Sequence, residues 1–89
     1  MSGAITYYAI TDGGATAERP LGLLRRLHHD DGPEDEGLRR DMSWARTSLI
    51  VEWEHGSLDE ELVEVSHEQA SRIVEYFRDK FAREGEPGD

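Results

Sequence analysis

The chain has 89 residues, 36% of them hydrophobic and 34% charged, and its formal net charge is −10. This length predicts one domain with a small core, and the lack of cysteine excludes disulfides, thiol nucleophiles and thiolate metal sites. The acidity disfavours direct binding to nucleic acid and to anionic membranes. Because no segment approaches the ~20 apolar residues of a membrane span, we expect a cytoplasmic protein that does not bind membranes.

Residues 5–10, ITYYAI, are rich in β-branched and aromatic residues and are followed by the turn-forming sequence TDGG, which predicts a strand. Both faces of this strand are apolar, so we expect it to lie centrally or to be covered on both sides. Residues 21–29 allow a strand or a helix, because three leucines have helical spacing while Gly22 disfavours a helix. We favour a strand that forms a hairpin with residues 5–10.

The acidic residues 30–37, DDGPEDEG, contain glycine and proline and predict a loop. In residues 38–46, the mostly apolar side chains at 38, 40, 42 and 44 alternate with the mostly polar ones at 39, 41, 43 and 45. This period of two predicts a third strand. For residues 47–55 both a strand and a short helix remain open. We favour the helix, because Thr47 can cap its start and Gly56 can end it.

The clearest element covers residues 66–82. Ser66 stands at the N-cap position, three residues before Gln69, as in a capping box. Apolar residues recur with helical spacing at Ala70, Ile73, Val74, Phe77 and Phe81. Residues 62–65 are a short strand or an extended lead-in to this helix.

These elements predict an α+β fold in residues 1–84, followed by a disordered tail at 85–89. We expect a small antiparallel sheet of about three strands, with the C-terminal amphipathic helix packed on one face and a short second helix elsewhere.

Most of the chain is similar to small uncharacterised proteins of actinobacteria, which also open on a tyrosine-rich strand and an arginine-rich stretch. The pattern that carries this resemblance is Trp44-x-x-Thr47-x-Leu49, Gly56, Glu64-Val65-Ser66-His67-Glu68-Gln69-Ala70, Ile73 and Val74. The resemblance implies a bacterial cytoplasmic protein and assigns no catalytic residue.

The motifs of catalysis and metal binding are missing from the sequence. The histidines lack the HExxH and His-x3-His spacings, and no serine lies in a GxSxG elbow. The glycine pair at 13–14 lacks a phosphate-binding pattern and is read as a turn. We therefore expect no enzyme activity, no cofactor and no metal.

Charged and aromatic residues supply the candidate interface. If residues 21–29 and 38–46 are adjacent strands, their arginines either form cross-strand ion pairs or face a partner. Both tryptophans are expected to pack under the final helix, or to anchor an interface if exposed. The candidate interface residues are Arg25, Arg26, Arg39, Arg40, Trp44, Glu52, Trp53, Glu54, Glu60 and Glu61.

The function predicted from these features is that of a non-enzymatic interaction module. Residues 1–46 carry eight acids and six arginines, whereas residues 47–89 carry twelve acids and four bases. This polarity favours a protein partner, either a basic protein or a second copy in a homodimer. The alternative is an acidic inhibitor or antitoxin-like protein that occupies a nucleic-acid-binding site on its partner.

Overall fold

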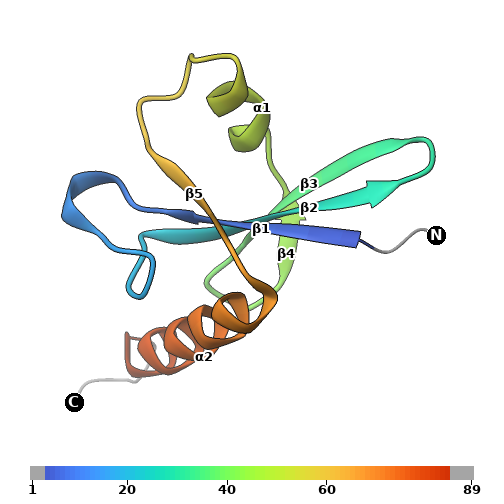
Figure 1. The fold of residues 1–89 in the computed structure, drawn as a ribbon. Helices are drawn as coiled ribbons and strands as arrows, with labels where there is room; N and C mark the ends of the chain where they lie inside the picture. Colours follow the sequence, from blue (N-terminus) through green and yellow to red (C-terminus); the bar gives the residue numbers. More distant parts are fainter. Residues whose placement is uncertain (1–3, 85–89) are drawn as a thin grey trace.

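The computed structural model describes residues 4–84 and contains one antiparallel sheet with a helix on each face (Figure 1). The strands are β1 (Ala4–Ile10), β2 (Gly22–His29), β3 (Gly32–Leu38), β4 (Trp44–Arg46) and β5 (Leu62–Val65). The helices are α1 (Leu49–Glu54) and α2 (His67–Glu84), and a short 3₁₀ turn covers Asp12–Gly14. The order of the strands in the sheet is β4-β3-β2-β1-β5.

The sheet divides the buried side chains into two clusters, because consecutive residues of a strand point to opposite faces. On the face that we call the α2 face, the cluster consists of Ala9, Leu23, Val65, Ala70, Ile73 and Phe77. On the opposite face, the α1 face, it consists of Ile10, Leu24, Ile50 and Leu62. The core therefore consists of two thin layers, one on each face of the sheet.

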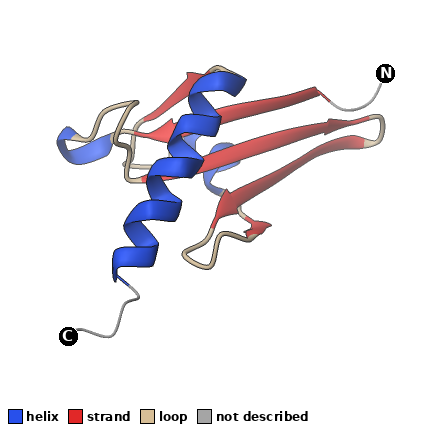
Figure 2. Cartoon of the chain, turned by 90° about the horizontal axis from the view of Figure 1, so that it is seen from below, coloured by secondary structure: helices blue, strands red, loops and turns tan. Residues whose placement is uncertain are grey.

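The predicted C-terminal helix is confirmed. The Gln69 backbone N–H donates to the Ser66 hydroxyl over 3.1 Å, so Ser66 caps the helix as expected. The apolar stripe buries Ala70, Ile73 and Phe77, and the helix crosses the sheet diagonally (Figure 2). No helix within residues 4–84 is long and apolar enough to cross a membrane.

The predicted hairpin of the first two strands is also confirmed. β1 pairs with β2 in a register that places Tyr8 opposite Leu24, and its other edge pairs with β5. β1 is therefore flanked by a strand on each side and covered by a helix on each face, which accounts for its two apolar faces.

The prediction of about three strands is wrong, because the sheet has five strands within residues 4–84. The acidic segment predicted as a loop at 30–37 forms β3, whose carboxylates face arginines of β2. The single strand predicted at 38–46 is interrupted by a turn and resumes only at β4. In this turn Met42 adopts a φ of 68°, a left-handed conformation that glycine usually supplies.

The two open readings in the second half are settled. Residues 49–54 form the favoured helix, α1, and Gly56 beyond it has a φ of 77°, as expected at a helix end. The helix begins one residue later than predicted, but the Thr47 hydroxyl still accepts a hydrogen bond from the Leu49 N–H over 3.2 Å. Residues 62–65 form strand β5, and the predicted tail at 85–89 lies outside the described residues.

Candidate interaction surface

Arg25 and Arg26 are neighbours on β2 and therefore point to opposite faces of the sheet. Arg25 lies on the α2 face opposite Glu36, and Arg26 lies on the α1 face opposite Asp35. The predicted strands at 21–29 and 38–46 are not adjacent, because β3 lies between β2 and β4. Arg25 and Arg26 instead form their cross-strand ion pairs with β3, the segment that was predicted to be a loop. These two arginines do not gather on one face.

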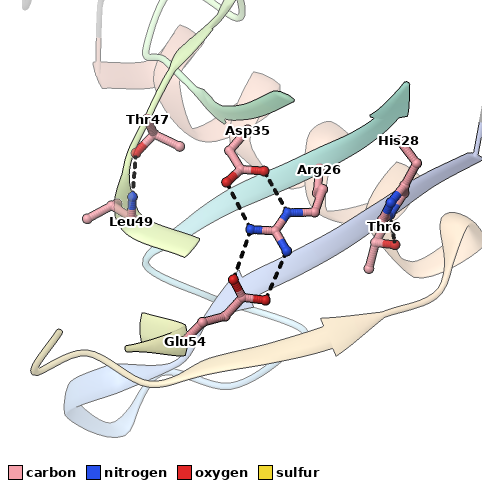
Figure 3. A network of polar contacts seen from close by, with 7 residues as sticks. All are labelled: Thr6, Arg26, His28, Asp35, Thr47, Leu49 and Glu54. Carbon is pink, nitrogen blue, oxygen red and sulfur yellow. Dashed lines mark hydrogen bonds and ion pairs between the residues drawn. The ribbon is translucent and has the colours of Figure 1, made fainter. Parts of the chain in front are cut away.

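Arg26 binds two carboxylates at once (Figure 3). Its guanidinium donates to Asp35 over 2.8 and 3.1 Å and to Glu54 over 2.9 and 3.1 Å. The side chains of Arg26 and Asp35 are 13% and 7% exposed, so water screens this pair weakly. Hydrogen bonds to both carboxylates raise the pKa of Arg26, and the Arg26 guanidinium lowers the pKa of Glu54. Because Glu54 belongs to α1, the network attaches that helix to the sheet.

Arg25 takes part in an aromatic cluster on the α2 face. Its guanidinium donates to Glu36 over 2.6 and 2.8 Å and lies 4.0 Å from the centre of the Trp44 ring. Tyr7 lies beside Trp44, with ring centres 6.4 Å apart, and meets the His67 ring edge-on at 5.2 Å. The cation is both paired and stacked, so its charge is satisfied within the chain.

Arg39 and Arg40 lie at the turn between β3 and β4. Arg40 pairs with Glu84 at the end of α2 and lies 5.0 Å from the centre of the Phe81 ring. Arg39 is exposed, and among residues 4–84 no carboxylate pairs with it. Of the four arginines predicted at the interface, three already bind carboxylates of the same chain.

The two tryptophans lie on opposite faces of the sheet. Trp44 packs against the cluster beneath α2, as predicted. Trp53 instead packs on the α1 face, where its ring centre is 5.9 Å from that of Tyr8. The expectation that both tryptophans lie under the final helix is therefore wrong for Trp53, because residue 53 belongs to the helix on the other face.

The predicted acidic residues differ in their surroundings. Glu52 accepts a hydrogen bond from the Ser48 hydroxyl, and Glu54 binds Arg26. Glu60 and Glu61 lie in the segment before β5, and neither forms an ion pair with a described residue. The predicted interface did not include their neighbours Asp59 and Glu64, although the acids at 59–61 and 64 are visible in the sequence.

The described surface includes two hollows. One, of about 510 Å³, lies between β3 and the start of α1 and is lined by His29, Glu34, Arg46 and Thr47 among others. The second, of about 300 Å³, is lined by Glu18 and by residues of the first turns of α2. No group of three His, Asp or Glu side chains within residues 4–84 is placed to hold a metal ion.

Comparison of this chain with protein-family models, with curated proteins and with solved structures found no match.

Proposed function

We propose that this chain is a small non-enzymatic interaction module that binds a basic segment of another protein. The proposal is based on the position of the negative charges that form no ion pair within the described residues. The arginines of the sheet bind the acids of β3, α1 and α2. Asp59, Glu60, Glu61 and Glu64 form no ion pair with a described residue, and these four unpaired acids lie within six residues of the sequence.

A basic partner is favoured over a second copy for an electrostatic reason. Two copies of a chain with a net charge of −10 repel each other at low salt. A lysine-rich or arginine-rich segment would be attracted by the same field and would neutralise the acids of residues 59–64. Assembly into a homodimer stays a prediction, which light scattering after size exclusion tests at about 50 mM and about 500 mM salt.

The proposal is tested with a fluorescent lysine-arginine peptide and two matched variants. The first variant removes the charges of residues 59–64 through Asp59→Asn, Glu60→Gln, Glu61→Gln and Glu64→Gln. The control removes equal charge elsewhere through Asp12→Asn, Glu18→Gln, Asp30→Asn and Asp31→Asn. We expect anisotropy to show peptide binding by the wild type and the control, and a loss of about tenfold or more in the first variant. Equal losses in both variants would mean that net charge alone attracts the peptide.

A further inference from the structure

Within residues 4–84, strand β5 forms one edge of the sheet and pairs only with β1. The Thr11 N–H donates to the Glu61 carbonyl over 2.9 Å at the start of this pairing. Hydrogen-bonded pairs alternate along an antiparallel ladder, so Val63 and Val65 turn their backbone groups toward β1. Leu62 and Glu64 therefore turn their N–H and C=O groups outward, and no partner within residues 4–84 bonds to them.

Two other free stretches of edge within residues 4–84, on β1 and on β3, are closed. β1 extends beyond β5, and there the Ile5 carbonyl accepts a hydrogen bond from the His67 ring nitrogen over 2.7 Å. β3 extends beyond β4, and by the same alternation Pro33, which has no N–H, holds the outward position. Edge strands with unpaired groups tend to add further strands, and the chain prevents this at both stretches. At β5 it does not.

The side chains of β5 specify what kind of strand would fit. Glu64 is exposed and points to the α1 face, whereas Val63 points to the α2 face and is 42% exposed. An added strand would therefore place a basic side chain opposite Glu64 and an apolar one opposite Val63. A second copy of β5 would bring two acidic segments of residues 59–64 side by side, and their like charges would repel each other. The short β4, at the far edge, carries the exposed cation Arg46, which would repel a basic strand.

We propose that the outer edge of β5 binds an extended basic segment of a partner protein by strand addition, in which alternate residues are basic and apolar. This inference rests on the proposed function and adds the mode of binding. The backbone groups of Leu62 and Glu64 would supply hydrogen bonds, and the acids of residues 59–64 would supply the attraction.

The test uses a short synthetic peptide of alternating lysine and valine, together with the same peptide N-methylated at the amides that would pair with β5. N-methylation keeps the charge and the side chains but removes the backbone donors. We expect the unmodified peptide to bind and the methylated one to bind about tenfold more weakly, because about two hydrogen bonds are lost. Amide shifts in NMR spectra should concentrate at residues 62–65.

A pair of protein variants tests the same hydrogen bonds from the other side. Glu64→Gln removes the charge alone, whereas Glu64→Pro also removes an outward N–H that β1 does not use. Circular dichroism verifies that both variants fold, and we expect the proline variant to bind the unmodified peptide more weakly than the glutamine variant.

The outcomes separate the two proposals. If methylated and unmodified peptides bind equally and the variant lacking the charges of residues 59–64 loses both, strand addition is overturned while binding of basic segments stands. If neither peptide, nor the lysine-arginine peptide, binds the wild type, both proposals are overturned.

Discussion

Arg26 is the residue whose charge contributes most directly to the fold, because it binds carboxylates of two other elements. It lies between Asp35 of β3 and Glu54 of α1 and forms an ion pair with each, so it connects the short helix α1 to the sheet. Removing the cation would leave two carboxylates facing each other, one of them only 7% exposed. Breaking such a pair costs more than the pair contributes, because the remaining charge stays buried without a partner.

We therefore expect Arg26→Met to lower the free energy of unfolding by about 2–4 kcal/mol. Arg26→Lys should lose about 1–2 kcal/mol, because an ammonium cannot bind two carboxylates in forked geometry. Arg72→Met is the control, since Arg72 and Glu68 form an exposed pair whose loss costs about 0.5 kcal/mol or less. Urea unfolding measures all three, and equal losses for Arg26→Met and Arg72→Met would contradict the role of Arg26.

The same network makes stability depend on pH. The pKa of Glu54 is lowered from its ordinary value of 4.5, chiefly by hydrogen bonds from Arg26. A carboxyl group with a lowered pKa contributes fully above its unfolded value and loses the contribution as the pH falls through its folded value. We expect the urea midpoint of the wild type to fall between about pH 5 and about pH 3 more steeply than that of Glu54→Gln. A Glu18→Gln control should follow the wild type; parallel curves for all three proteins would refute this linkage.

At the scale of elements, the short helix α1 depends on how it ends. Gly56 follows its last turn with a φ of 77°, and a Cβ placed there would meet no atom within 4 Å. The cost of a side chain at this position is therefore conformational rather than steric. We expect Gly56→Ala to lower the free energy of unfolding by about 1 kcal/mol.

Gly56→Asn serves as the matched variant, because asparagine tolerates the left-handed region better than alanine. It should lose less stability than Gly56→Ala in the same urea titration. If alanine is accepted without loss, the end of α1 does not require the left-handed conformation.

Strand β3 shows how an element can form against its composition. The sequence GPEDEGL has few residues that favour strands, yet Asp35 and Glu36 gain the arginines of β2 as cross-strand partners. Pro33 is tolerated because it lies where the ladder requires no N–H. Both conditions are set by neighbouring strands, so a local pattern could not reveal them.

At the scale of the whole molecule, two thin clusters share one sheet. Trp44 packs on the α2 face and Trp53 on the α1 face, so the fluorescence of each follows the unfolding of one face. Because every strand between them belongs to the same sheet, we expect the faces to unfold together. In Trp44→Phe the fluorescence of Trp53 should follow the far-UV circular dichroism with the same urea midpoint, and the converse should hold for Trp53→Phe. Distinct midpoints would show that one helix detaches before the sheet unfolds.

The sequence by itself determined the elements whose signals are local. The apolar stripe and the Ser66 cap defined α2, the β-branched and aromatic run defined β1, and the caps around residues 47–56 favoured α1. The turn within 38–46 escaped notice because Met42, rather than glycine, takes the left-handed conformation.

Only the tertiary structure decided which charges remain available. Arg25, Arg26 and Arg40 were candidate contacts in the sequence, but strand pairing and the position of α2 give each a carboxylate within the chain. The open edge of β5 was likewise invisible, since it depends on which strand lies outermost and which backbone groups its neighbour uses. Pairing between distant segments determines both features, and no local spacing encodes such pairing.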